Sequence, residues 1–368
     1  MRKIFAAGLA LLLSTTAQAQ DADSVPAVEL PAASVTKVMT AAVNGFIRPG
    51  YDAFETSAQD VADKSAALCK APSVANLDVV KTAFRALVVS WGSIEIVRTG
   101  PIIEQNRFER VLFYPDRKST GLKQVQAVLA KKDETATDPT TLAAKSVATQ
   151  GLGALEYLLY GTNADRDLLQ AENAFRCRYA AAAAQNVANV AKEVAGIWDA
   201  PDGIAKTWEQ PGPDNPAFRT GGEAITALLG ILVHGAEAVR DQRIETFYKG
   251  AGKATFPKQA LFWRSQNTWD SLHGNLDGLS KLLATSGMVE LLQEKDQPVV
   301  AATQARLQSM IATARTVMPN IELAVENPGE QAKLQSLLDG GKDVIAKLND
   351  GYGGAIGLSS GFSFADGD

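Results

Sequence analysis

The sequence predicts an all-α protein made of two related antiparallel helical bundles, a duplicated unit, followed by a glycine-rich C-terminal tail. Apolar residues recur at spacings of three and four, as in VANLDVVKTAFRALVVSWGSIEIVR and ITALLGILVHGAEAVRDQRIETFY. Stretches with strict alternation of apolar and polar residues are scarce. Proline and glycine fall between the apolar runs, at RPGYD, YPDR, TDPTT and PGPDNP. These observations favour long helices over strands.

Residues 1–19 have the composition of a cleavable secretory signal peptide. Arg2 and Lys3 precede the apolar run IFAAGLALLLSTT, and AQA at 17–19 places small residues before a cleavage site after Ala19. The apolar run is shorter than the ~20 residues that a membrane helix needs, and no cysteine beside the site could carry a lipid. The sequence therefore predicts a periplasmic protein without a lipid anchor and without a transmembrane segment in the mature chain.

The chain is acidic. It has 36 Lys and Arg against 41 Asp and Glu, a net charge of −5, which becomes −7 when residues 1–19 are removed. No basic cluster stands out, so neither nucleic acid nor anionic lipid headgroups are expected as partners. The mature length exceeds that of a comfortable single core, which favours two domains.

The composition along the chain indicates where these domains meet. The stretch WEQPGPDNPAFRTGG carries three prolines and three glycines between two apolar, helical blocks, as expected of a linker. The last eighteen residues hold six glycines and read as a tail or covering loop. The predicted parts are the signal peptide 1–19, an N-terminal bundle 33–207, a linker 208–222, a C-terminal bundle 223–350 and a tail 351–368.

Two apolar helices of the first half each carry one glutamate. One helix is expected to begin at Asp138-Pro139 and to end at Gly161, about twenty residues later. In SIEIVRTG and ALEYLLYG, Glu95 and Glu156 each precede a glycine by five positions. We therefore expect two carboxylates at an equivalent depth, facing one shared site.

Buried carboxylates need a partner, because an unpaired charge in an apolar environment is costly. Trp91, Glu95 and Arg98 follow one another at spacings of four and three, which places them on one helix face. Arg98, Arg107 and Arg110 are the candidate cations. Two interpretations stay open: a buried network of arginines and glutamates that ties helices together, or a polar pocket that binds a cation or small ligand. In the second, Glu95 and Glu156 are candidate ligands for iron or another divalent metal.

Other catalytic patterns are weak. His234 and His273 are the only histidines, and no H-E-x-x-H occurs, which excludes a zinc protease of that motif. Cys69 and Cys177 are the only cysteines, and an even pair in an exported protein favours a disulfide. The alternative is two buried free thiols that pack as small apolar residues.

Several stretches occur in an order that resembles the imelysin-like proteins: SWGSIEIVRTGP, NRFERVLFYPDR, LKQVQAVL, SVATQGLGALEYLLYG, FRCRYAAAAAQNVANVA, FWRSQNTWDSLHGNLDGLSKL and GFSFADGD. The resemblance covers nearly the whole mature chain. It implies an all-α fold of two related bundles, a functional site between the halves and an association with iron acquisition. The Gly-x-His-x-x-Glu signature of the family falls on Gly151 and Glu156, with Gly153 at the histidine position.

The leading functional interpretation is a non-enzymatic periplasmic protein of iron acquisition. It binds a ligand in a polar pocket between the bundles, or docks an envelope iron-uptake or cytochrome-type partner. By analogy with the family, Arg264, Ser265 and Asn275 of the second half form the opposite wall. The alternatives are a metal-dependent peptidase of the imelysin type, which lacks a side-chain ligand at Gly153, and an envelope interaction scaffold.

Overall fold

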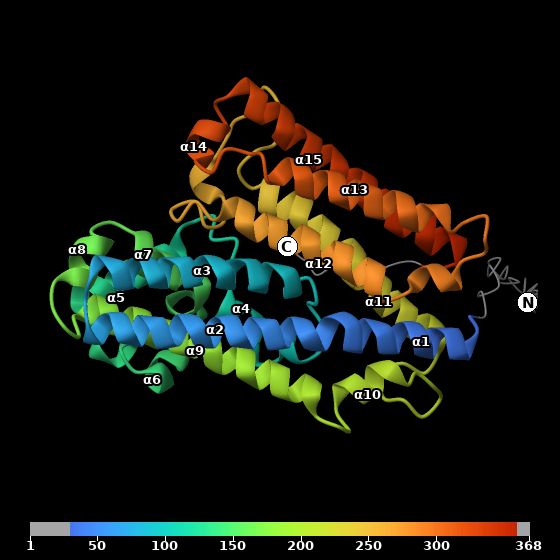
Figure 1. The fold of residues 1–368 in the computed structure, drawn as a ribbon, viewed down its shortest axis with the longest axis horizontal. Helices are drawn as coiled ribbons and strands as arrows, with labels where there is room; N and C mark the ends of the chain where they lie inside the picture. Colours follow the sequence, from blue (N-terminus) through green and yellow to red (C-terminus); the bar gives the residue numbers. More distant parts are fainter. Residues whose placement is uncertain (1–29, 359–368) are drawn as a thin grey trace, which may run out of the picture.

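A computed structural model of the chain describes residues 30–358 (Figure 1). These residues form helices and turns, with one isolated antiparallel bridge between Tyr248 and Thr255. The predicted all-α fold is confirmed. The predicted signal peptide and the last ten residues of the predicted tail lie outside the described part.

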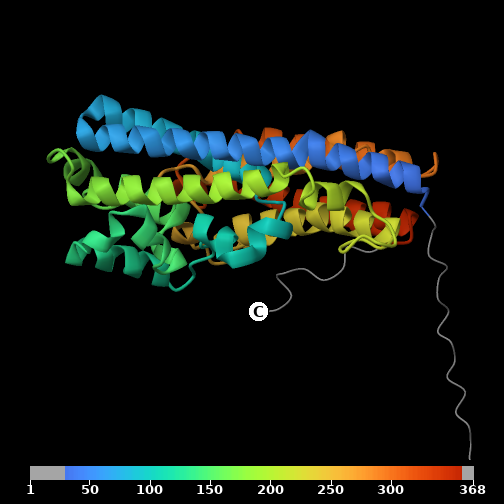
Figure 2. The ribbon, with the colours of Figure 1, turned by 90° about the horizontal axis from the view of Figure 1, so that it is seen from below.

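The N-terminal half is organised around α2, which packs between α3 and α9 (Figures 1 and 2). Shorter helices, α4 to α7, lie beside α9 on the face away from α2 (Figure 2). The helices of this half are α1 (Ala32–Ala42), α2 (Arg48–Lys70), α3 (Val74–Ile94), α4 (Arg107–Val111), α5 (Thr120–Lys131), α6 (Pro139–Ala143), α7 (Gly151–Tyr160), α8 (Ala164–Leu169), α9 (Phe175–Asp199) and α10 (Ile204–Glu209).

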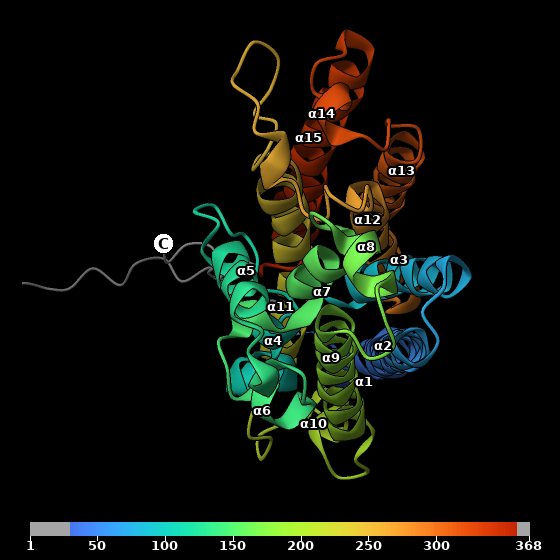
Figure 3. The same cartoon turned by 90° about the vertical axis from the view of Figure 1, so that its left-hand side faces the viewer.

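In the C-terminal half, α13 packs against both α12 and α15, and α15 also contacts α11 (Figures 1 and 3). The helices are α11 (Gly221–Glu237), α12 (Thr268–Thr285), α13 (Pro298–Ala314), α14 (Ile321–Ala324) and α15 (Pro328–Ala346). Turns of π-helix extend α1, α11 and α15 at Val43–Ile47, Ala238–Ile244 and Lys347–Gly353, and short 3-10 helices lie at Gly100–Asn106, Glu134–Ala136, Val147–Thr149, Pro257–Gln259 and Met288–Leu291.

Side chains that cap the first turn explain where several helices begin. The side chain of Ser73 accepts a hydrogen bond from the backbone of Asn76 at the start of α3. At the start of α11, the side chain of Thr220 accepts a hydrogen bond from the backbone N–H of Glu223. Such caps satisfy backbone N–H groups that have no partner within the helix. Local sequence therefore fixes these boundaries.

The two halves are joined through α3 and α12, whose backbones cross at close range. A Cβ added to Gly274 would lie 2.5 Å from the carbonyl oxygen of Val89, and one added to Gly278 would clash with the carbonyl oxygen of Ser93. Only glycine leaves room for this approach. The crossing has a direct consequence for function, because it brings Asn275 of α12 to the end of α3.

One hydrophobic core runs through both halves, with α1 packed against α11 at one end. The linker prediction covers the end of α10, the irregular residues 210–220 and the start of α11. The division into two folding units, and their origin by duplication, stay predictions. Gly221–Ile244 is long and apolar enough to cross a bilayer by length and composition, but most of its apolar stretch is buried against the rest of the chain, as in core helices.

Cys69, near the end of α2, and Cys177, near the start of α9, form a disulfide. The predicted pairing is confirmed. The bond links two of the long helices of the N-terminal half at one end, where the backbone N–H of Asn173 also donates to the carbonyl of Cys69.

The single helix expected from Asp138 to Gly161 is wrong. Asp138 does cap a helix, α6, but that helix ends at Ala143, and α7 starts afresh at Gly151. Gly151 has φ of +79°, and a Cβ there would lie 2.5 Å from the carbonyl oxygens of Arg110 and Val111. Close packing against the preceding chain thus interrupts the helix and gives α7 its own direction.

Candidate functional site

Glu156 lies in the middle of α7, and its carboxylate is buried. Its Oε1 accepts hydrogen bonds from the backbone N–H and the hydroxyl of Ser265, both at 3.0 Å. Nη1 of Arg264 lies 3.8 Å from Oε2. Burial raises the pKa of the Glu156 carboxyl, while the hydrogen bonds from Ser265 and the charge of Arg264 oppose this increase. The glutamate is thus held by two residues from the other half of the chain.

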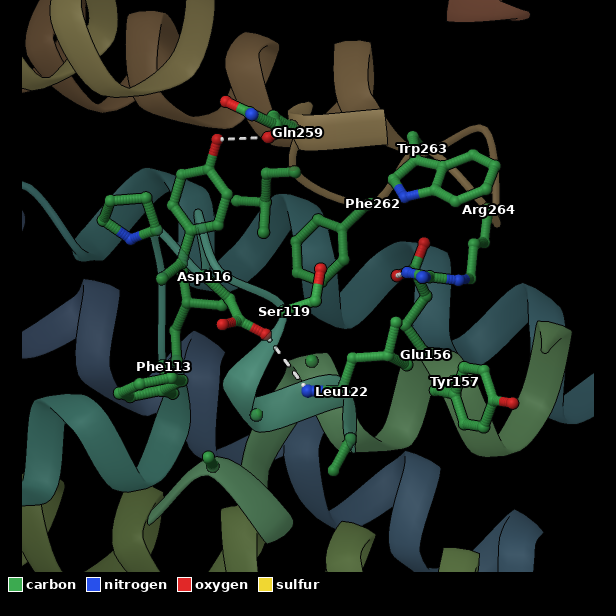
Figure 4. Close-up of a pocket in the computed structure, with 18 of the residues that line it drawn as sticks. Phe113, Asp116, Ser119, Leu122, Glu156, Tyr157, Gln259, Phe262, Trp263 and Arg264 are labelled. Atoms are coloured by element: carbon green, nitrogen blue, oxygen red, sulfur yellow. Dashed lines mark hydrogen bonds and ion pairs between the residues drawn. The ribbon is translucent and has the colours of Figure 1, made fainter. Parts of the chain in front are cut away.

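Aromatic rings fix the position of Arg264 (Figure 4). Its guanidinium lies 4.5 Å from the ring centre of Trp263 and 5.5 Å from that of Tyr157. Cation–π contacts of this kind stabilise an arginine that is partly removed from water. The residues at 262–266 precede α12, so this loop delivers both partners of Glu156.

A cavity of about 110 Å³ lies beside Glu156 (Figure 4). Gly153, one helical turn before Glu156, lines it, and a Cβ added to Gly153 would meet no atom within 4 Å. The position that holds histidine in the family signature therefore faces open space. Charged residues around the cavity are Asp116, Arg117, Lys258 and Arg264, besides Glu156 itself.

Glu95 follows the last residue of α3 and is also buried. Its Oε1 accepts from Nδ2 of Asn275 at 2.5 Å and pairs with Nη2 of Arg243 at 2.9 Å. Nδ2 of Asn275 also donates to the carbonyl of Gly92 at 2.8 Å. Glu95, Asn275 and Arg243 line a second, much larger cleft of about 1320 Å³.

The expectation of one shared site for the two carboxylates is wrong, because Glu95 and Glu156 line different cavities. Residues 113–117 line both and form the wall between them. The hydroxyl of Tyr114 donates to backbone carbonyls of the second half, at Gln242 (3.0 Å) or Gln259 (2.9 Å). This anchored segment separates the two glutamates, which sequence spacing could not indicate.

The sequence predicts that Trp91, Glu95 and Arg98 share one helix face, but the structure does not place them so. α3 ends at Ile94, so Arg98 lies beyond the helix, where it stacks on Phe108 at 4.2 Å. Trp91 is fully buried against Phe108 and lines neither cavity. Arg98 does line the larger cleft. Trp91 is therefore a core residue. Arg98 faces the larger cleft from the segment after α3, not from the helix face that was predicted.

The candidate cations Arg107 and Arg110 pair with neither glutamate. Arg107 forms an ion pair of 2.7 Å with Glu193, and Arg110 donates to Asn186 at 3.3 Å. Both arginines thus tie α4 to α9 and line neither cavity. Gly151 also lines neither, because its role is in the backbone at the start of α7.

Arg243, the cation that holds Glu95, was missed by the sequence reasoning. A signal existed, because Arg243 continues the buried face formed by Leu232, Ala236 and Val239 at spacings of three and four. An arginine at the end of such a face requires an acidic partner. Of the residues expected on the wall opposite Glu156, Ser265 and Arg264 do contact its carboxylate, whereas Asn275 contacts Glu95 in the other cavity.

The donor atoms do not fit the metal that the family signature implies. Ser265 and Arg264 occupy the two oxygens of Glu156, Gly153 supplies no donor, and Glu95 is paired with Arg243. Residues 30–358 contain no group of three or more His, Cys, Asp or Glu placed to hold a metal ion. A divalent ion at either carboxylate would have to displace an arginine and find further ligands.

These features define a class of all-α proteins in which buried carboxylates and cavities lie where two sets of helices meet. The sequence profile of the imelysin family, Peptidase M75, matches residues 47–348. The chain therefore belongs to the imelysin family. No curated protein sequence matches the chain.

Two solved structures share the fold. One is an imelysin-like protein from Psychrobacter arcticum 273-4, with a TM-score of 0.75 and 19% identity over 92% of this chain and 100% of the other. The second is described as an iron-regulated protein A precursor from Parabacteroides distasonis ATCC 8503, with a TM-score of 0.70 and 14% identity over 89% of this chain and 95% of the other. At these identities the likeness shows the fold alone.

Proposed function

We propose that this imelysin-family chain is a non-enzymatic, periplasmic protein of iron acquisition that binds a ligand or an envelope partner at the Glu156 cavity. The observation that carries the proposal is the open space at Gly153 beside a buried carboxylate held by Arg264 and Ser265. This arrangement offers fixed polar groups and a hollow, which are the elements of a binding site.

Further observations support the setting. Residues 1–19 have the pattern of a secretory leader, and the Cys69–Cys177 disulfide fits an oxidising compartment. One structural neighbour is described as an iron-regulated protein precursor. The partner in this proposal is an iron-uptake or cytochrome-type envelope protein, and iron enters bound to a carrier or to that partner.

Metal-dependent peptidase activity is the alternative that the family name raises. A catalytic metal needs several protein ligands and an open position for water. The cavity offers only Glu156 among the residues of the family signature that could bind a metal, and Glu156 is engaged by Ser265. A role as an interaction scaffold uses the outer surface and predicts no effect of changes inside the cavity.

Complementation under iron limitation tests the proposed function. A host that lacks the gene is supplied with the wild-type chain, with Glu156→Gln, or with Glu294→Gln as a control that removes an equal charge at an exposed position outside the cavity. We expect Glu156→Gln to fail to restore growth in iron-poor medium while growth in iron-rich medium is normal. Glu294→Gln should restore growth in both media.

Equal growth of all three strains would overturn the proposal. Thermal melts of the purified variants establish that each one folds. Release of peptide fragments by the wild-type chain, abolished by chelators and by Glu156→Gln, would replace the proposal with the peptidase alternative.

A further inference from the structure

The larger cleft has a floor made of buried polar groups whose hydrogen bonds are incomplete. Glu95, Arg243 and Asn275 are each at least nine-tenths buried. Within the described residues, Oε2 of Glu95, Nε and Nη1 of Arg243 and Oδ1 of Asn275 have no hydrogen-bond partner. Buried polar atoms normally have partners. The floor thus combines unused acceptors with unused donors.

The charges that face this cleft are unevenly balanced. Its acidic side chains are already engaged: Asp116 by backbone N–H groups, Glu223 by the N–H of Arg219, Glu237 by His234, Asp241 by Arg240 and Glu95 by Arg243. Its basic side chains have fewer such partners. The Arg98 guanidinium is 3.7 Å from Glu109, beyond hydrogen-bond distance. Burial lowers the pKa of Arg98, the charge of Glu109 opposes this decrease, and the charge of nearby Arg243 adds to it.

The rim of the cleft adds positive charge in an otherwise acidic protein. Arg117 and Lys118 line the cleft, are exposed, and form no ion pair with the residues at 30–358. Apolar walls at Phe108, Phe218 and Ile231 complete the cleft. Positive groups with low-dielectric walls attract anions.

We propose that this cleft binds a hydroxy-polycarboxylate, an organic acid that carries several carboxylates and a hydroxyl group. Its carboxylates contact Arg243 at the floor and the part-buried Arg98, because guanidinium groups bind carboxylates through paired charge-assisted hydrogen bonds. The ammonium group of Lys118 attracts a further carboxylate at the rim. Its hydroxyl donates to Asn275 Oδ1 or Glu95 Oε2. An ammonium ligand is disfavoured beside two guanidinium groups.

This site is distinct from the Glu156 cavity and does not depend on the function proposed for it. Arg98, Lys118, Arg243 and Asn275 line the larger cleft alone. Acids of this class also chelate ferric iron through their carboxylates and hydroxyl, so the cleft suits either the free acid or its iron complex.

Isothermal titration calorimetry of the whole chain with metal-free citrate tests the proposal. Tricarballylate, which has the three carboxylates of citrate but no hydroxyl, is the matched ligand. We expect saturable binding of one citrate per chain and about tenfold weaker binding of tricarballylate, as for one lost hydrogen bond to a buried acceptor. Absence of citrate binding overturns the site, and equal affinity for the two acids overturns the hydroxyl contact.

Two variants locate the bound acid. Arg98→Gln should weaken citrate binding about 10- to 100-fold, the range for a hydrogen bond to a charged group. Lys118→Gln, which lies on an exposed loop and leaves the core intact, should weaken it a few-fold in a salt-dependent manner. Lys295→Gln removes an equal exposed charge elsewhere and should have no effect.

Glu156→Gln separates the two cavities. It should leave citrate affinity unchanged, whatever its effect on growth in iron-poor medium. Loss of citrate binding in Glu156→Gln together with full binding in Arg98→Gln would assign the acid to the smaller cavity and overturn the proposal. An equal loss in Lys118→Gln and Lys295→Gln would do so as well.

Discussion

The ion pair between Arg243 and Glu95 gives the sharpest prediction about stability. The two side chains are 7% and 4% exposed, and their nearest charged atoms are 2.9 Å apart. At an effective dielectric constant of about 20, unit charges at this distance attract by about 6 kcal/mol. Removal of one partner from such a pair costs about 3–5 kcal/mol, because the other charge remains buried. We therefore expect Arg243→Met to lower the free energy of unfolding by that amount.

A double-mutant cycle tests the reasoning. In Arg243→Met with Glu95→Gln no buried charge remains, and the amide oxygen of glutamine still accepts from Asn275. The double variant should recover most of the lost stability, so that the two changes are far from additive. Urea unfolding followed by circular dichroism gives the four free energies, those of the wild type, Arg243→Met, Glu95→Gln and the double variant. The exposed pair Lys37–Glu290 is the control, with a coupling below about 1 kcal/mol.

A different outcome would refute the account of the pair. If Arg243→Met costs less than about 1 kcal/mol, the guanidinium does not neutralise Glu95 in the folded protein. If the cost in the double variant equals the sum of the single costs, the two side chains are not coupled, and the cleft floor is not the charge pair described above.

Three further predictions concern the site and its frame. Burial raises the pKa of Glu156, so the carboxyl contributes its full stability below its unfolded pKa near 4.5, and this contribution is lost as pH rises through the folded pKa. The unfolding free energy of the wild type should therefore fall relative to that of Glu156→Gln above about pH 4.5. Parallel pH profiles of the two proteins would contradict this. Gly274→Ala should lower the free energy of unfolding by about 1–3 kcal/mol or more, because its methyl group clashes with the carbonyl oxygen of Val89. Gly153→Ala meets open space and should leave that free energy unchanged or raise it by up to ~1 kcal/mol in urea unfolding. Equal effects of the two changes would refute the close crossing. Reduction of the Cys69–Cys177 bond, which spans 108 positions, should lower the unfolding free energy by about 4–5 kcal/mol, and an unchanged melting temperature after reduction would contradict the contribution assigned to it.

The carboxylates show how far residue-level reasoning reached into the site. Glu95 and Glu156 were expected to be buried and paired, because each stands among apolar residues, and both are. Their partners were only half found. Arg264, Ser265 and Asn275 came from the family resemblance, while the sequence pointed to arginines close to Glu95. Of these, Arg107 and Arg110 instead contact α9, and Arg98 lies near Glu109.

The sequence alone determined the all-α fold and the start of several helices, because helical periodicity and capping depend on residues a few positions apart. It also indicated the cysteine pair. Tertiary structure decided that α7 begins at Gly151, that Arg243 neutralises Glu95, and that residues 113–117 divide one expected pocket into two. These outcomes depend on contacts between residues far apart in the sequence, such as Asn275 and Glu95, which lie 180 positions apart, and no local pattern encodes such a contact.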